Sequence, residues 1–270
     1  MTNELWNSSA AGIARAVRRR EVTATEVIQS HLDRIEAVNP RLNAVTVVFT
    51  EAMDEARRLD ARIRDGEDVG RLAGVPFTVK ENVDVAGYPT THGVPHFRDA
   101  VAKRDAPPVL RLRSAGAIPI GHSNMPDLTI GGNNTVSQLY GETLNPWGAV
   151  RTPAGTSGGD AVATAAGMAA IGLGNDSGGS VRLPAMFCGV TALRPSNGRV
   201  AQDHRIGGQE PTLASQLFPV DGPLARDVTD LSLAFAALTG ADSTDPRALP
   251  ELAAGPRLPR RVAVCADPVG

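Results

Sequence analysis

Lysine is almost absent from this chain, and one of its lysines stands where a charge is costly to bury. Of the 27 basic residues, 25 are arginine and only Lys80 and Lys103 are lysine. Lys80 ends the apolar run GVPFTVK, residues 74–80, which is typical of a short β-strand. A buried ammonium can lose its proton, whereas a guanidinium does not, and so Lys80 is a candidate general base. The alternative from its position is a strand-end lysine paired with Glu81.

Two glycine-rich segments with hydroxyl groups could supply what such a base deprotonates. They are AGTSGG, residues 154–159, and DSGGS, residues 176–180. Glycine-flanked serines are common in ordinary turns, and so neither segment by itself indicates catalysis. The second segment leaves four successive backbone amides with little side chain around them, those of Ser177, Gly178, Gly179 and Ser180. Such amides can converge on an oxyanion, with Ser180 as nucleophile, and each donor contributes about 2.7 to 4 kcal/mol to acyl transfer.

Two other interpretations of this stretch fit less well. GLGNDSGG resembles a phosphate-binding loop, but the chain has no GxxxxGK[ST] signature. Its GxG also falls at the end of a small-residue helix expected over residues 161–174, where a nucleotide loop follows a strand. A Ser-His-Asp triad would need His122 or His204 beside Ser180, and nothing in the sequence places either of them there.

The overall composition favours a globular protein that acts on a small molecule. The chain has 270 residues, 42% of them hydrophobic, and a formal charge of -2. The hydrophobic residues are enough to form a sizeable core. The slightly negative net charge leaves no surplus of basic residues for binding nucleic acid. The N-terminus has no export pattern and no run of about 18 apolar residues occurs, so we expect no membrane insertion and a cytoplasmic location.

No metal and no cofactor is predicted. Cys188 and Cys265 form no CxxC pair, and Cys188 is expected to be a small buried apolar residue. His92 and His96 have the spacing of zinc ligands on a helix, but the glycine and proline between them are incompatible with that helix.

Hydrophobic periodicity predicts helices first and then an alternation of helices and strands. Helices are expected over residues 5–20, 23–38 (ending before Pro40), 49–65, 106–115 and 226–239, and strands at 74–80, 117–121 and 261–265. Polar residues dominate 131–160, which is expected to be a functional loop region. This order predicts an α/β fold in a single domain over 1–270. Its parts would be a helical segment (1–66), a catalytic core (67–240), and a proline-rich connector with a final strand (241–270).

Three motifs, in order and in spacing, resemble the amidase signature family. They are GVPFTVKEN, RTPAGTSGGDAVATAAG and GLGNDSGGSVRLPAMFCGVTALRPSNGRV, and the resemblance extends over about residues 5–240. It implies a hydrolase that cleaves amide bonds through an acyl-enzyme with a Ser-Ser-Lys triad. It also implies a mixed central β-sheet covered by helices on both faces.

By this resemblance Ser180 is the nucleophile, Lys80 is the base, and Thr156 takes the place of the bridging serine, beside a cis peptide bond. Thr156 is a departure from the family, because its methyl group restricts χ1 and crowds the site. Ser157 matches a supporting serine that could take over the relay, and it ranks second to Thr156.

The resemblance also covers charged residues around these groups. Asp176 and Arg182 match positions that hold the loop in place. Asp160 is a second departure, since the family has a small residue there, and a carboxylate at this position is expected to alter the local field.

The substrate implied by the resemblance is a small or aryl amide, with the loop Leu128 to Asn134 lining the pocket. The alternative is the glutamine-hydrolysing A subunit of an aminoacyl-tRNA amidotransferase, whose usual acidic and basic residues are missing from GHSNMPDLTIGG. The family's domain is longer than this chain, so the fold is expected to be incomplete at the C-terminus. The chain would then be either an amidase or an inactive subunit that needs a partner, such as a second copy or the missing C-terminal half.

Overall fold

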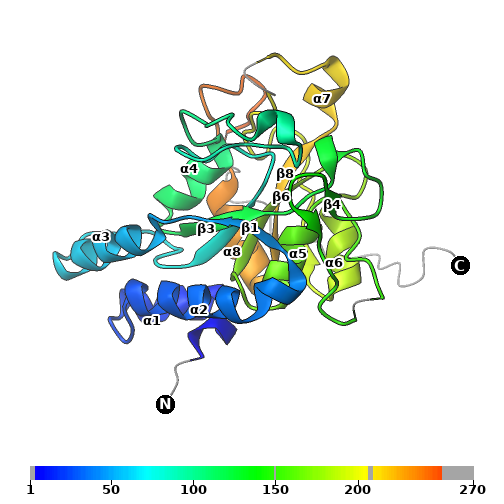
Figure 1. Cartoon of the computed structure of the whole chain (residues 1–270). Coiled ribbons are helices and arrows are strands. Elements are labelled where there is room, and N and C mark those ends of the chain that lie inside the picture. The colour runs from blue at the N-terminus through cyan, green and yellow to red at the C-terminus, as the bar shows by residue number, and fades with distance from the viewer. Residues whose placement is uncertain (1–3, 149, 206–208, 251–270) are drawn as a thin grey trace, which may run out of the picture.

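A six-stranded mixed β-sheet forms the centre of the molecule (Figure 1). The computed structural model describes residues 4–148, 150–205 and 209–250. In spatial order the strands are β1 (Val45–Val48), β3 (Ile118–Ser123), β2 (Pro76–Lys80), β6 (Ile171–Asp176), β8 (Val220–Ala225) and β7 (Thr191–Ala192). Strand β2 runs parallel to both of its neighbours, and the other pairings are antiparallel. A separate two-stranded ribbon is made of β4 (Val136–Ser137) and β5 (Gly141–Glu142).

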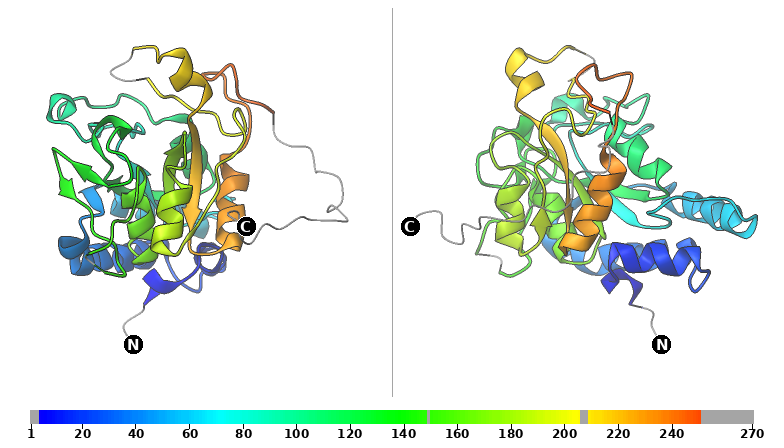
Figure 2. Two further views of the ribbon diagram at one scale, coloured as in Figure 1. Left: turned by 90° about the vertical axis from the view of Figure 1, so that its right-hand side faces the viewer. Right: turned by 180° about the vertical axis from the view of Figure 1, so that it is seen from behind.

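Helices cover both faces of this sheet, as expected. They are α1 (Ala10–Arg18), α2 (Ala24–Leu42), α3 (Ala52–Arg64), α4 (Pro107–Ser114), α5 (Gly158–Ala165), α6 (Arg182–Cys188), α7 (Leu213–Leu217) and α8 (Val228–Leu238). Among the described residues, single 3-10 turns are formed by η1 (Leu5–Asn7), η2 (Pro95–Phe97) and η3 (Asp127–Thr129). The left view of Figure 2 shows α5 and α6 on one side of the sheet and α8 on the other. The predicted α/β class is therefore confirmed.

The core lies between the sheet and these helices. Its largest fully buried side chains include Phe77, Ile120, Ile171 and Leu173 from the strands, Ile28 from α2 and Leu112 from α4. Burying an aliphatic or aromatic side chain of this size contributes about 1.5 to 3 kcal/mol each, which fixes the strands that carry the site. Within the described residues, no helix combines the length and the apolar character that crossing a membrane requires.

The N-terminal segment differs from the expected run of helices. The helix predicted over 5–20 is divided into η1 and α1, and Ser9 caps α1 by accepting a hydrogen bond from the Gly12 N–H at 3.0 Å. The helix predicted over 49–65 begins only at α3. Strand β1, which was not anticipated, precedes α3 and joins the central sheet through β3.

The second helix extends beyond its predicted end. Thr23 and Glu26 form the predicted capping box, but α2 continues through Pro40 instead of ending before it. Proline lacks the N–H that would donate to the carbonyl four residues earlier, so the last turn of α2 has one backbone hydrogen bond fewer. The helix ends where Asn43 adopts a left-handed conformation with φ of 51°.

The small-residue helix predicted over 161–174 is wrong in its second half. Helix α5 ends before Gly167, whose φ is +74°, and the residues from Ile171 onward form strand β6. Short runs of alanine, glycine and aliphatic residues suit a buried strand as well as a helix, so periodicity could not separate the two. Gly172 and Gly174 let α5 pack closely, because a Cβ at either position would lie within 3 Å of Asp160 or Ser157.

One predicted strand is not described. The run RVAVC, residues 261–265, and Cys265 within it lie outside the described residues, as does the connector beyond residue 250.

Candidate active site

The ends of two parallel strands bring the site together. Strands β2 and β6 lie side by side, with Val79 opposite Leu173, so their carboxyl ends meet at one edge of the sheet. This is the edge at which open α/β sheets bind ligands. Lys80 ends β2 there, and Asn175 is the next-to-last residue of β6. Because β8 is antiparallel to β6, it begins at the same edge and places Asp221 opposite Asn175.

Lys80 is completely buried, and its amine contacts Thr156 and Asn175 instead of Glu81, its neighbour in sequence. Its Nζ donates to Thr156 Oγ1 at 2.6 Å and to Asn175 Oδ1 at 2.7 Å, and the Asn175 carbonyl oxygen lies 3.5 Å away. The side-chain amide of Asn175 is held in turn by Asn82, because Asn175 Nδ2 donates to Asn82 Oδ1 at 2.9 Å. The asparagines were not anticipated from the sequence.

The strand-end pair of Lys80 with Glu81 does not form among the described residues. Glu81 is buried and its carboxylate accepts hydrogen bonds from the hydroxyls of Thr46, Thr91 and Tyr140 at 2.7 to 2.9 Å. Glu81 is the first residue after β2, and among the described residues its carboxylate contacts these hydroxyls and not the Lys80 amine. This leaves Lys80 available for chemistry.

The environment of Lys80 favours the neutral amine. Burial lowers the pKa of Lys80 from 10.5 to about 7, against the opposing effect of the carboxylates of Asp160, Asp221 and Asp176. A neutral amine has two N–H groups and one lone pair. With the two oxygens of Asn175 accepting the N–H groups, the lone pair can face Thr156.

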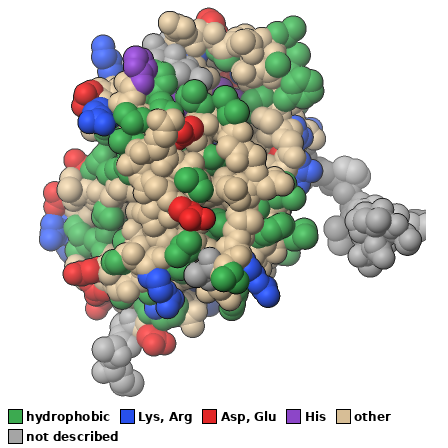
Figure 3. Space-filling model, turned by 45° about the vertical axis from the view of Figure 1, so that its right-hand side comes forward, with side chains coloured by type: hydrophobic (Ala, Val, Ile, Leu, Met, Phe, Trp, Pro, Cys, Tyr) green, Lys and Arg blue, Asp and Glu red, His purple; other side chains and the backbone are tan. Residues whose placement is uncertain are grey.

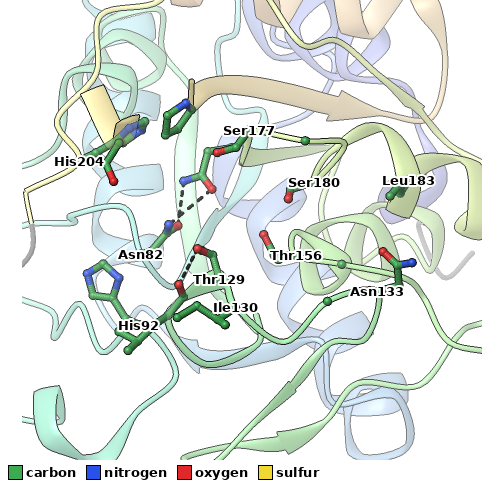
Figure 4. A pocket seen from close by; sticks show the side chains of 17 residues that line it. Asn82, His92, Thr129, Ile130, Asn133, Thr156, Ser177, Ser180, Leu183 and His204 are labelled. Carbon is green, nitrogen blue, oxygen red and sulfur yellow. Dashed lines mark hydrogen bonds between the residues drawn. The ribbon is translucent and has the colours of Figure 1, made fainter. Parts of the chain in front are cut away.

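Thr156 contacts Lys80 and lines the same pocket as Ser180. It follows the cis peptide bond Gly155–Thr156, which the family resemblance had implied. Its side chain faces Ser180 across the pocket (Figure 4). Ser157 plays a different part, because its Oγ donates to the Asn175 carbonyl at 3.3 Å and its N–H donates to the Ser180 carbonyl at 3.0 Å. The side chain in contact with Lys80 is thus that of Thr156, the residue ranked first.

The loop before Ser180 is held by contacts of Asp176 with Arg182 and with backbone amides. Arg182 binds the carboxylate of Asp176 with both Nε and Nη2, each at 3.0 Å. The N–H groups of Gly179 and Val181 donate to the same carboxylate at 2.7 and 3.1 Å. Burial would raise the pKa of Asp176, but these bonds lower it to about 2. The loop is therefore anchored to the end of β6.

The contact with Asp176 bears on the expected oxyanion hole. The Gly179 N–H is already bonded to Asp176 and is not free for an oxyanion in this arrangement. The predicted donors are thereby reduced to the amides of Ser177, Gly178 and Ser180. Ser177 and Gly178 are exposed, and a Cβ on Gly178 would meet no atom within 4 Å, so a substrate can reach this backbone.

A pocket of about 390 Å³ opens over these groups (Figure 4). Thr156, Ser177, Gly178 and Ser180 line it, and Lys80 lies beneath it, fully buried. From the predicted lining loop, five residues line this pocket, namely Leu128, Thr129, Ile130, Gly132 and Asn133. Leu183 adds an apolar side chain from α6.

Two histidines in this pocket were not anticipated. Burial lowers the pKa of His92 to about 4, so it is neutral near pH 7. For His204, burial favours a lower pKa, but the Asp221 carboxylate, 3.1 Å from Nε2, raises it above its ordinary value. The pairing of His204 with Asp221 depends on where β8 begins beside β6, and no local sequence pattern predicts it.

The cysteine and histidine side chains considered as metal ligands form no metal site among the described residues. Cys188 is buried, as predicted, and burial raises the pKa of its thiol to about 12. In the part of the chain that the structure describes, no three His, Cys, Asp or Glu side chains gather as a metal site would require.

Comparison with known proteins identifies the family of the chain. The family model described as Amidase matches residues 26–266. The indoleacetamide hydrolase of Bradyrhizobium diazoefficiens is 42% identical over 254 residues, which make up 94% of this chain and 48% of that protein. The A subunit of the glutamyl-tRNA(Gln) amidotransferase of Bdellovibrio bacteriovorus is 40% identical over 90% of this chain and 48% of that protein.

Solved structures with a similar fold are also amidases. The peptide amidase from Stenotrophomonas maltophilia has a TM-score of 0.83 and 33% identity, covering 92% of this chain and 51% of that one. A bacterial aryl acylamidase of the amidase signature family also has a TM-score of 0.83, with 33% identity over 90% of this chain and 50% of that one. The chain spans about half the length of the relatives it matches. From its sequence and its fold, the chain belongs to the amidase family.

Proposed function

We propose that this chain carries the catalytic groups of an amide hydrolase, with Ser180 as nucleophile, Thr156 as proton relay and Lys80 as general base. The observation that supports this most strongly is the 2.6 Å contact between Nζ of a fully buried lysine and the hydroxyl of Thr156, whose side chain faces Ser180 in the pocket (Figure 4). A nucleophile within reach of a base that a third group orients is the arrangement required for covalent catalysis. Here Asn175 orients the base.

Acylation follows from these contacts. Neutral Lys80 accepts the Thr156 hydroxyl proton as Thr156 accepts the proton of Ser180, and the Ser180 oxygen bonds to the amide carbonyl carbon. The carbonyl oxygen becomes an oxyanion, which the amides of Ser177, Gly178 and Ser180 are placed to bind. The ammonium of Lys80 then returns its proton through Thr156 to the departing nitrogen, and the C–N bond breaks. Water attacks the resulting ester by the same relay and releases the acid.

The substrate class that we propose is a small or aryl primary amide. Leu128, Ile130 and Leu183 make part of the pocket wall apolar, while Asn82 and Asn133 supply amide groups for orientation. The relatedness to an indoleacetamide hydrolase and an aryl acylamidase supports this choice.

Ammonia release from a panel of amides tests the proposal. Indole-3-acetamide, benzamide and L-glutamine are incubated with the full chain, with Ser180→Ala, and with Ser232→Ala as the matched control at a serine of α8 outside the pocket. We expect release from an aryl amide that Ser180→Ala abolishes and Ser232→Ala preserves. Release that is equal in all three proteins would contradict the role of Ser180.

A glutamine-hydrolysing subunit is the second candidate, favoured by the 40% identity to the A subunit of a glutamyl-tRNA(Gln) amidotransferase. Such a protein would release ammonia from L-glutamine and not from the aryl amides. The same panel therefore separates the two candidates.

Dependence on a partner or on a further part of the domain is the third candidate. Trp147, Met186 and Phe187, at and near α6, expose 67%, 77% and 41% of their surface, and apolar side chains are visible across this side of the molecule (Figure 3). Exposed apolar groups of this size are typical of surfaces that another chain covers. Activity that appears only on adding a separately produced C-terminal half of a related amidase would support this candidate.

A further inference from the structure

The buried carboxylate of Asp160 lies near Lys80 and has no role in the acylation proposed for Ser180. Asp160 stands in the first turn of α5 and is fully buried. Its Oδ1 accepts a hydrogen bond from Thr78 Oγ1 at 2.8 Å. The Ser123 hydroxyl lies close to Asp160, but neither Ser123 Oγ nor Asp160 Oδ2 has a hydrogen bond of normal geometry among the described residues. A carboxylate with so few bonds is costly to bury unless a positive charge is near.

Strand geometry brings to Asp160 the amine of Lys80, which is positively charged once it has taken up a proton. Thr78 and Lys80 are two residues apart on β2, so their side chains lie on the same face of the sheet, about 6.6 Å apart along the strand. Asp160 reaches this face because Gly172 has no side chain, and a Cβ there would lie 2.9 Å from the Cβ of Asp160. Asp160, Thr78 and Lys80 thus share one buried space between α5 and the sheet.

The other carboxylates near Lys80 have basic partners of their own. Asp176 of β6 is bound by Arg182, and Asp221 of β8 is paired with His204. Asp160 has no such partner within the described ranges, and burial raises its pKa while Lys80 acts to lower it.

Two nearby histidines are not partners of Asp160 either. His92, on the pocket side, has a pKa lowered to about 4 by burial, so it is neutral near pH 7. His122 of β3 pairs with Val79 and therefore lies on the sheet face opposite to that of Lys80 and Thr78, with its Nδ1 3.2 Å from the Val79 carbonyl oxygen. Glu81 is occupied by three hydroxyls, as described above.

We propose that Asp160 is a positioning residue for the base, an ionised carboxylate that pairs with Lys80 when Lys80 takes up the proton of Ser180. The proposal rests on the proposed function. In the reactive form Lys80 is neutral and Asp160 is ionised. Proton transfer through Thr156 then produces an ammonium opposite a carboxylate, and the buried pair is neutral as a whole. Without the carboxylate, the lysine would be a weaker base, and its ammonium would lack compensation.

The lysine content of the chain allows a direct test. With only two lysines, a protein made with lysine labelled with carbon-13 at Cε gives two lysine resonances by NMR, and Lys103→Arg assigns them. We expect Asp160→Asn, which keeps an oxygen acceptor for Thr78, to lower the titration midpoint of Lys80 by about one pH unit or more, a tenfold change in proton affinity. The midpoint of exposed Lys103 should stay unchanged as an internal control. Asp160→Ser provides a second neutral variant if the asparagine does not fold.

An unchanged Lys80 midpoint in both variants would overturn the role of Asp160. The NMR readout does not require turnover, so it can be set against covalent labelling of Ser180 in the unaltered protein. An unlabelled Ser180 with a lowered Lys80 midpoint would overturn the proposed function and support the Lys80–Asp160 pair. A labelled Ser180 with an unchanged midpoint would support the proposed function and overturn the pair.

Discussion

Nζ of Lys80 lies 2.6 Å from Oγ1 of Thr156, across 76 residues of sequence. The contact joins the end of strand β2 to the residue two positions before helix α5. It connects a buried amine to the hydroxyl that faces Ser180 in the pocket.

Lys80→Met should nearly abolish reaction at Ser180. The methionine keeps much of the length of the lysine side chain but cannot accept a proton, and loss of a general base costs a factor of about 10² to 10⁴ in rate. The rate of ammonia release is the measurement, and Lys103→Met at an exposed position is the matched control. Comparable loss in the two variants would contradict a specific role for Lys80.

Thr156→Val should be inactive, whereas Thr156→Ser should keep activity or gain it. Valine has nearly the shape of threonine without the hydroxyl, so it interrupts the relay. Serine keeps the hydroxyl and removes the methyl group that restricts χ1. Steady-state rates of the two variants form an internally controlled pair. An active Thr156→Val protein would transfer the relay role to another group, such as Ser157.

The reaction should gain rate as pH rises through about 7. A lysine with its ordinary pKa of 10.5 would be almost fully protonated at pH 8, but burial lowers the pKa of Lys80 to about 7. Its cation cannot accept a proton, so activity is present above this pH and is lost as the pH falls below it. Second-order rates of inactivation by a sulfonyl fluoride, taken from pH 5 to pH 10, give the midpoint. Neither a flat profile nor a midpoint near 10 is compatible with this assignment.

Asp176→Asn should loosen the loop and lower the free energy of unfolding. The substitution removes the negative charge that Arg182 and the amides of Gly179 and Val181 contact. Loss of such buried charge-assisted bonds costs about 1 to 3 kcal/mol. Because bonding lowers the pKa of Asp176 to about 2, the difference from the unaltered protein should be full above about pH 4 and should shrink as the pH falls toward 2.

Urea unfolding at several pH values measures this difference. A difference between the two proteins that is the same at pH 3 and pH 7 would show that Asp176 does not act through its charge.

Gly159→Ala should destabilise the fold near the site. A Cβ at Gly159 would lie 2.4 and 2.5 Å from the backbone nitrogen and oxygen of Asn124, and neither atom can move freely. Overpacking of this kind costs about 1 to 3 kcal/mol. Gly148→Ala is the matched control, because a Cβ at Gly148 meets no atom within 4 Å. Thermal unfolding should separate the two variants, and equal melting temperatures would contradict the close packing of α5.

The parts of the fold that sequence could predict were those with a strong local signal. The run that became β2 and the helices α4 and α8 had clear periodicity or clear ends. Strand β6 was assigned to a helix, because alanine and glycine fit both structures and only packing under α5 decides between them. Strand β1 is four residues long and gains its stability from β3, which lies more than 70 residues away.

The candidate site likewise contains residues that the sequence could predict and residues that it could not. The rarity of lysine singled out Lys80, the bare backbone of DSGGS singled out Ser180, and the family resemblance implied Thr156. Asn175 and His204 could not be found by the same means. Asn175 reaches Lys80 only because β6 lies parallel to β2, and His204 enters the pocket only by pairing with Asp221 on β8. Such positions depend on sheet register and not on local sequence.

Covalent labelling of Ser180 tests the central claim most directly. The full chain is treated with phenylmethanesulfonyl fluoride near pH 8, and the modified residue is located by peptide mass spectrometry. We predict a single adduct on Ser180 that is retained in Lys103→Met and lost in both Lys80→Met and Ser180→Ala. The absence of any adduct on Ser180, or an adduct that forms at an undiminished rate in Lys80→Met, would contradict the proposed relay.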